Sequence, residues 1–264
     1  MPAGAPIVLV TVATAEAELA ADALWVAGAA AVEERPGPSA DLVTLVADVA
    51  PADPSASWVV EHAVVDDGLD AWRAHAGVWR AGRFTVTPPW LAATGDVVLM
   101  IDPGHAFGSG SHPTTRLVLG ALDHIVGAGD AVLDVGCGSG VLAIASASLE
   151  AAKVDAIDID PEALAATTAN AAANGWAEVV HASDALLAEL TGPYDVVAAN
   201  IGAASLRDLA GDIERVLAAD GRVVLSGVLA DDVDSVVAAF AGSRVVEQHE
   251  EGGWVAVVLA PGTA

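Results

Sequence analysis

The chain has 264 residues, of which 54% are hydrophobic, and its formal net charge is −26. No run of about 18 uninterrupted apolar residues is present and the first residues lack the basic segment of a secretory signal, so we expect a cytoplasmic protein without a membrane span. Ten Lys and Arg against 36 Asp and Glu argue against direct binding of nucleic acid and favour a basic protein partner.

Residues 1–65 predict a small α+β domain without a cluster of catalytic residue types. An Ala- and Glu-rich helix is expected over 15–27, with Thr14 as its N-cap and Gly28 ending it. The expected strands of this domain are 7–12, 30–34, 42–49 and 58–65.

The segment 66–93 differs in composition from both of its neighbours. It contains Trp72, Trp79 and Trp90 and the turn Pro88-Pro89. We predict a linker whose tryptophans pack across two domains, and the second domain is expected over residues 94–264.

The segment 101–115 is rich in glycine and directly precedes a predicted helix. It holds His105, Phe107 and His112. Two interpretations stay open: a lid that folds over a ligand, or a surface connection that ends in a helix cap. Zinc binding by the two histidines lacks a third ligand, and the single cysteine, Cys137, excludes a multi-cysteine site, so we expect no metal.

A glycine loop, Asp134-Val-Gly-Cys-Gly-Ser-Gly140, lies between a predicted strand and a predicted helix. Gly136, Gly138 and Gly140 allow a sharp turn and a close approach of backbone to a ligand. The spacing differs from the Gly-x-Gly-x-x-Gly pattern of dinucleotide folds. The acid at Asp134 suits a cationic ligand, so S-adenosylmethionine fits better than NAD.

Polar residues follow the next strands of this predicted sheet, where ligands of open α/β sheets bind. Asp158 is expected to accept hydrogen bonds from ribose hydroxyls, and Asp160 to cap the following helix. Asp184 either accepts from an adenine amino group or caps a helix that begins at Ala185. Asn200 ends the fourth strand and faces the position of methyl transfer.

Strands and helices alternate from residue 94 onward, which predicts a doubly wound, mostly parallel seven-stranded α/β sheet with a Rossmann-like arrangement. Only four residues separate the last two strands, so these should pair antiparallel. This is the architecture of class I methyltransferases. The expected strands are 131–135, 154–158, 178–182, 194–200, 221–226, 244–249 and 254–259, and the helices are 113–126, 141–149, 161–173, 203–218 and 231–240.

The motifs at 102–115, 134–140, 158–161 and 200–201, in this order and spacing, resemble the ribosomal protein L-eleven (L11) methyltransferases, the PrmA family. The likeness covers about residues 70–260. It implies an S-adenosylmethionine-dependent enzyme whose cofactor contacts fall on Thr115, Gly136, Asp158 and Asn200. Ser109 stands where the family has threonine, and Gly202 where it has leucine, which leaves the acceptor open.

The resemblance implies methylation of lysine or N-terminal amines of L11. Asn200 would orient the amine, His105 or His112 would relay its proton, and Phe107 would close the channel. We expect a monomer. The alternatives are a methyltransferase of this fold that acts on another protein or a small-molecule amine, an NAD-linked dehydrogenase, which Asp134 disfavours, and a non-catalytic adaptor.

Overall fold

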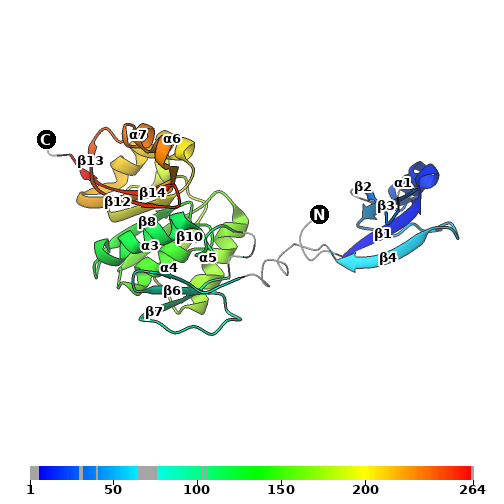
Figure 1. Cartoon of the computed structure of the whole chain (residues 1–264), viewed down its shortest axis with the longest axis horizontal. Coiled ribbons are helices and arrows are strands. Elements are labelled where there is room, and N and C mark those ends of the chain that lie inside the picture. The colour runs from blue at the N-terminus through cyan, green and yellow to red at the C-terminus, as the bar shows by residue number, and fades with distance from the viewer. Residues whose placement is uncertain are drawn as a thin grey trace. The chain divides into compact units, whose positions relative to one another are not determined.

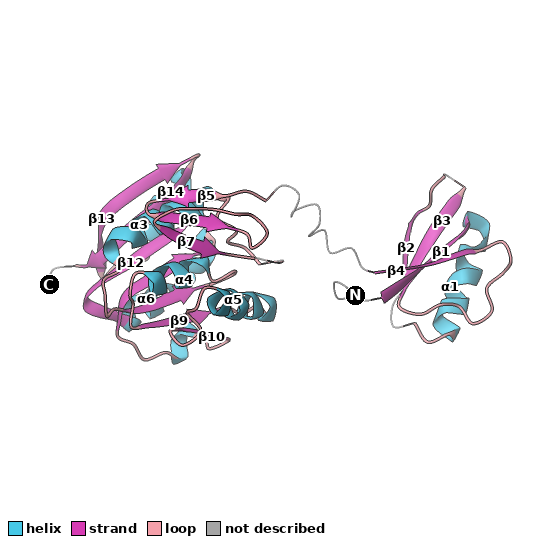
Figure 2. Cartoon of the chain, turned by 90° about the horizontal axis from the view of Figure 1, so that it is seen from below, coloured by secondary structure: helices cyan, strands magenta, loops and turns pink. Residues whose placement is uncertain are grey.

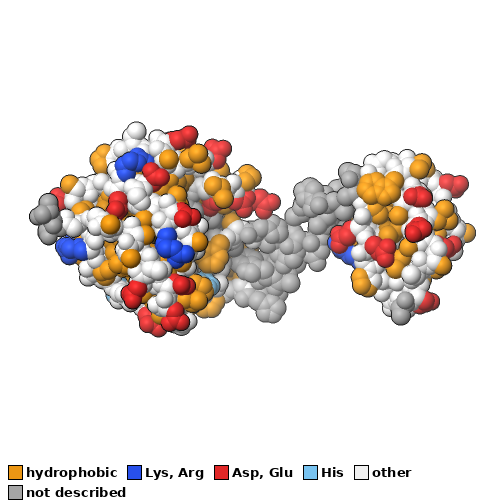
Figure 3. Space-filling view, turned by 90° about the horizontal axis from the view of Figure 1, so that it is seen from above, with side chains coloured by type: hydrophobic (Ala, Val, Ile, Leu, Met, Phe, Trp, Pro, Cys, Tyr) orange, Lys and Arg blue, Asp and Glu red, His pale blue; other side chains and the backbone are white. Residues whose placement is uncertain are grey.

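A computed structural model describes residues 6–29, 32–39, 41–64, 76–102, 104 and 106–262. The chain forms two compact units, Met1–His75 and Ala76–Ala264, and each is described here by itself (Figure 1). No helix of the described ranges is long and apolar enough to cross a membrane. Acidic side chains are scattered over the face in Figure 3, with only a few basic ones, as the net charge requires.

The first unit is an antiparallel sheet with one helix on a face. Its strands are β1 (Pro6–Ala13), β2 (Val32–Pro36), β3 (Leu42–Ala47) and β4 (Val59–Val64), in the order β2-β3-β1-β4. Helix α1 (Ala17–Val26) buries Ala20 and Leu24 in the small core. Gly28, with φ +95°, ends this helix as predicted. Thr14 was wrongly predicted as the cap, because a 3-10 turn (Thr14–Glu16) precedes the helix and makes Glu16 its N-cap.

The second unit contains the predicted seven-stranded sheet, in the order β10-β9-β8-β11-β12-β14-β13. The last two strands pair antiparallel as expected, and β14 lies between β12 and β13 (Figure 2). Strands β12 and β14 also pair antiparallel, and the remaining neighbours pair parallel. The strands are β8 (Ala131–Val135), β9 (Lys153–Ile157), β10 (Val180–Ser183), β11 (Tyr194–Asn200), β12 (Leu217–Leu229), β13 (Ser243–Glu251) and β14 (Trp254–Pro261).

Helices cover both faces of this sheet and give it two cores. Neighbouring strand residues alternate between the cores: Val132 faces one and Leu133 the other. This double burial explains why the strands are continuous apolar runs in the sequence. The helices are α3 (Pro113–Ile125), α4 (Val141–Ser148), α5 (Pro161–Ala173), α6 (Ala203–Val216) and α7 (Val233–Val237). The last is shorter than predicted, since a 3-10 turn (Ala230–Asp232) precedes it.

A second, three-stranded sheet in this unit was not predicted. It consists of β5 (Trp79–Ala81), β6 (Phe84–Thr87) and β7 (Val97–Met100). Two of these strands lie inside the range 66–93 that we predicted as linker, and Phe84 is fully buried in the core that α3 and α4 share. Residues 65–75, which hold Trp72, lie outside the described residues.

Candidate active site

The glycine loop joins the end of β8 to the start of α4. A Cβ on Gly138 would lie 2.5 Å from the carbonyl oxygen of Phe107, and one on Gly136 would lie 2.3 Å from Cγ2 of Ile201. Both glycines also have positive φ, +53° and +75°. Glycine is therefore required at both positions, which bring the loop against the 101–112 segment and the end of β11.

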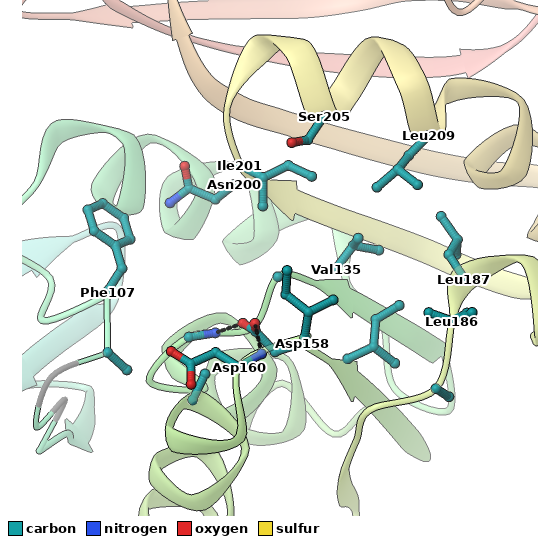
Figure 4. A pocket seen from close by; sticks show the side chains of 17 residues that line it. Phe107, Val135, Asp158, Asp160, Leu186, Leu187, Asn200, Ile201, Ser205 and Leu209 are labelled. Atoms are coloured by element: carbon teal, nitrogen blue, oxygen red, sulfur yellow. Dashed lines mark hydrogen bonds between the residues drawn. The ribbon is translucent and has the colours of Figure 1, made fainter. Parts of the chain in front are cut away.

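Asp158 follows β9 and binds the glycine loop. Its Oδ2 accepts from the backbone N–H of Gly138 at 3.0 Å, and its Oδ1 from the N–H of Asp160 at 3.0 Å (Figure 4). A carboxylate accepts about four hydrogen bonds, so each oxygen keeps a position for a ligand. Asp160 caps α5 as predicted, because its Oδ1 accepts from Glu162 N–H at 2.9 Å.

The segment before α3 is bonded to the glycine loop. Ser139 donates its N–H to the carbonyl of Phe107 at 2.8 Å and its hydroxyl to the carbonyl of Gly108 at 2.9 Å. Asn170 on α5 donates to the carbonyls of Asp102 and Ser139, both at 2.9 Å, and accepts from Asp102 N–H at 3.0 Å. These bonds attach Asp102, Phe107 and Gly108 to the glycine loop and to α5, in the place of a lid.

A cavity of about 480 Å³ opens at the carboxyl ends of the parallel strands. Phe107 lies at one end and Leu186 and Leu187 at the other, with Asp158 between them (Figure 4). The size is that of a cofactor site. The predicted site residues that it brings together are Phe107, Gly136, Gly138, Asp158 and Asn200.

A second cavity, of about 280 Å³, shares Phe107, Asn200 and Ile201 with the first. Its further lining comes from the starts of α3 and α6 and from β12 and β14: His112, Thr114, Gly202, Gly227 and Trp254. Two ligands, one in each cavity, would therefore meet at Asn200. The Oδ1 atom of Asn200 is buried and has no hydrogen-bond partner among the described residues.

His112 forms part of the second cavity and caps α3. Its Nδ1 accepts from Thr114 N–H at 3.4 Å and lies 2.8 Å from the Thr114 hydroxyl, so the neutral ring carries its proton on Nε2. The ring packs edge-on against two other aromatic rings. The distance between ring centres is 5.3 Å to Phe107 and 4.8 Å to Trp254. Burial, and then the positive charge of Arg116, lower the pKa of His112 and keep it neutral.

Asp134 lies beneath the glycine loop and lines neither cavity. Its Oδ2 accepts from Ala143 N–H at the start of α4, at 3.1 Å, and its Oδ1 has no partner among the described residues. Burial raises the pKa of Asp134 to about 7. Since the carboxyl is sealed behind the loop, the structure does not bring it to the ligand site that we predicted for it.

Other predicted site residues also lie outside the two cavities. Gly140 is the N-cap of α4, and Thr115 is buried in α3 with an unpartnered hydroxyl in the described structure. Asp184 is exposed, and the helix that it was expected to cap is a 3-10 turn (Leu187–Glu189) without a side-chain cap bond. His105 lies outside the described residues.

Sequence reasoning missed several cavity residues, among them Ile159 and Trp254. Ile159, between two acids, is 90% exposed and lines the first cavity. An isoleucine in an otherwise polar loop was the sequence signal that could have identified it. Trp254 lines the second cavity and follows the glycine pair of the β13–β14 turn. Nothing in the sequence connects it to His112, because sheet order brings the two together.

The donor set suits S-adenosylmethionine. Asp158 offers acceptors for hydroxyl groups, Ile159 and Leu186 offer apolar surface, and Asn200 has an unused acceptor next to the second cavity. No group of three or more His, Cys, Asp or Glu side chains in the described ranges could hold a metal ion.

Comparison with known proteins gives one consistent result. A sequence profile described as ribosomal protein L11 methyltransferase (PrmA) matches residues 30–261. The chain is 43% identical over 199 residues to the ribosomal protein L11 methyltransferase of Geobacter sp. strain M21, and 40% identical over 222 residues to that of Geobacter metallireducens. These alignments cover 72% and 81% of this chain, and 65% and 72% of the relatives.

Among solved structures, the chain is similar to the ribosomal protein L11 methylase of Lactobacillus delbrueckii subsp. bulgaricus. The TM-score is 0.65 at 31% identity, and the match covers 70% of this chain and 98% of that one. Because the matched segment spans just under two thirds of the strain M21 relative, activity and substrate are carried over below as proposals.

Proposed function

Because the chain belongs to the ribosomal protein L11 methyltransferase (PrmA) family, we propose that it transfers the methyl group of S-adenosylmethionine to an amine of L11. The single observation that carries this proposal is the position of Asn200, where the two cavities meet. One cavity is then the cofactor site and the other the entry for the acceptor amine.

The bound cofactor supplies a methyl group that its sulfonium already activates. The chain's residues therefore have to bind, align and exclude water. Asp158 and the glycine loop supply polar groups to the lining of the first cavity, while Leu186 and Leu187 line the end away from Phe107. Phe107 lines both cavities.

The acceptor must be neutral to attack. A lysine amine with a pKa of about 10.4 costs roughly 4–5 kcal/mol to deprotonate at pH 7, and an N-terminal amine about 1 kcal/mol. The carboxamide oxygen of Asn200 can orient an amine without adding a full negative charge, which would favour the protonated form. Phe107, His112 and Trp254 in the wall of the second cavity likewise add no negative charge beside the amine.

We assign His112 to this wall rather than to proton transfer. A proton added to the neutral ring would go to Nδ1, which accepts the Thr114 bonds at the start of α3. Protonation would therefore break the helix cap. The amine proton leaves to solvent before the amine enters, and His112 stays neutral throughout.

The remaining assignments follow from a ribosomal protein substrate. We propose that the reaction takes place in the cytoplasm, that the small N-terminal unit recognises L11, and that one copy of the chain suffices, since one chain contributes both cavities. No direct contact with nucleic acid is part of this proposal.

The test is incubation of the purified protein with isotope-labelled S-adenosylmethionine and recombinant L11, followed by mass spectrometry of intact L11 and its peptides. We expect labelled methyl groups on amines of L11. Asn200→Ala should lose most of the turnover but still bind S-adenosylhomocysteine in calorimetry. If L11 stays unlabelled while another protein or a small amine of an extract is labelled, the acceptor is that molecule and not L11. If Asn200→Ala keeps full activity, that residue has no part in the mechanism.

A further inference from the structure

Arg116, on the first turns of α3, connects three separate parts of the second unit. Its guanidinium donates to the carbonyl of Ser111 and to the carboxylate of Glu251, with Nε 3.1 Å from Oε1. It also lies 5.4 Å from the centre of the Trp79 ring. The Arg116 side chain is 17% exposed and that of Glu251 44%, so the guanidinium is shielded from water while the carboxylate of the pair stays partly solvated.

Both hydrogen-bonded partners stand next to the aromatic wall of the second cavity. Ser111 directly precedes His112, and Glu251 begins the turn that leads to Trp254. The ring centres of His112 and Trp254 are 4.8 Å apart, and both residues line the cavity. One guanidinium thus binds the backbone carbonyl directly before His112 and the side-chain carboxylate of Glu251, three residues before Trp254.

We propose that Arg116 is a positioning residue for methyl transfer, because it holds His112 and Trp254 together as the wall against which the acceptor amine is aligned. This inference rests on the proposed function of the second cavity. Arg116 does not line that cavity and acts only through its two anchors. Loss of alignment by about 1 Å costs on the order of 100-fold in rate.

The charge of Arg116 supports the same role. It stands on the helix that His112 caps and lowers the pKa of that histidine, so it helps to keep the ring neutral. Glu251, from the hairpin, is the acidic group of this cluster and is paired with the same guanidinium. Four further titratable groups line the same cavity as Arg116 and Glu251: Arg80, His124, His249 and Glu250. A neutral replacement of Arg116 removes the cation and leaves Glu251 unpaired, and both changes favour a protonated His112.

Two variants separate geometry from charge. Arg116→Gln removes both, whereas Arg116→Lys keeps the charge but cannot reach Ser111 and Glu251 with one planar group. Arg83→Gln is the matched control, because Arg83 forms a similar ion pair with Asp123 at the other end of α3, away from the cavities. We would measure kcat and KM for L11, the dissociation constant of S-adenosylhomocysteine, the melting temperature, and the pKa of His112 by NMR.

We expect Arg116→Gln to lower kcat about 10- to 100-fold with unchanged cofactor affinity, and to raise the pKa of His112. Arg116→Lys should restore the pKa but only part of kcat, and Arg83→Gln should match the wild type in both. Unchanged kcat and unchanged His112 pKa in Arg116→Gln would overturn the proposal, as would an equal loss of kcat in the control. If the wild type does not methylate L11, the proposed function fails on its own, and the His112 pKa together with the Trp254 indole signal still decides whether Arg116 holds the ring pair.

Discussion

At the scale of single residues, Asp134 shows how an acid in a ligand motif can serve the loop rather than the ligand. It is 1% exposed, and one of its oxygens accepts a hydrogen bond from the first turn of α4 while the other has no partner in the described structure. A neutral carboxyl costs less in this setting than a carboxylate. The acid therefore joins β8 to α4 and fixes the conformation of the glycine loop between them. The cavity lies on the other side of this loop.

This burial gives a prediction for stability against pH. The pKa of Asp134 is about 7 in the folded chain and 3.8 in an ordinary aspartate. Between these values the folded state holds a proton that the unfolded state has lost, so this contribution to stability is complete below pH 4 and is lost as pH rises to 7. It amounts to at most about 4 kcal/mol. The unfolding free energy, measured by urea titration from pH 4 to pH 8, should lack this decline in Asp134→Asn. If the free energies of variant and wild type fall in parallel with pH, the prediction is contradicted.

Gly202 provides a second prediction at this scale. Its φ of −63° suits any residue, a Cβ there meets no atom within 4 Å, and the residue lines the second cavity. Glycine is therefore not needed for the backbone at this position, and the space beside it is open. Gly202→Leu should fold with a loss of about 1 kcal/mol at the helix N-cap and should narrow the cavity.

We expect Gly202→Leu to raise KM for L11 severalfold and to leave the dissociation constant of S-adenosylhomocysteine unchanged. Gly202→Ala, which adds one carbon, is the matched control and should stay near the wild type in both. A leucine variant with unaltered KM would mean that the amine does not enter through this cavity.

At the scale of elements, helix α5 holds the backbone that leads into the lid. Asn174 bonds both the N–H and the carbonyl of Met100, at 2.9 and 2.7 Å, and Asn170 does the same for Asp102. The two asparagines are four residues apart and so lie on one face of the helix. These side chains satisfy backbone groups at and after the end of β7 as a neighbouring strand would. Asn170 also donates to the carbonyl of Ser139 and so binds the glycine loop to the same helix.

Removal of the Asn170 amide takes this partner from three backbone groups, one buried and two partly buried, and an unsatisfied buried group costs about 1–3 kcal/mol. Asn170→Ala should therefore lower the unfolding free energy by several kcal/mol and weaken binding of S-adenosylhomocysteine, because the lid and loop separate. Calorimetry and thermal unfolding measure both. Thr168→Ala is the control on the same helix, since its exposed hydroxyl bonds only the Leu164 carbonyl. A loss of stability with unchanged affinity would show that lid and loop are not coupled through this residue.

At the scale of the whole molecule, sequence and structure agree where burial alone determines the element. Strand β8 has the predicted bounds 131–135, because a strand buried on both faces is a continuous apolar run. Strands β5 and β6 were missed: each has three or four residues, and packing against α3 and α4 rather than a repeating pattern fixes them. Asp158 and Asn200 could be predicted for the site from strand ends. The contact of His112 with Trp254 could not, since it depends on which strand lies beside which.

The insertion of β14 between β12 and β13 has a consequence for the order of folding. Residues 254–261 leave the ribosome after all the other strands of this sheet, yet they form the only link between β13 and the other strands. A nascent chain can thus complete the cofactor side of the fold, up to β12, while the wall that Trp254 provides is still missing. Competence to hold a cofactor would then precede competence to modify a substrate during synthesis of each molecule.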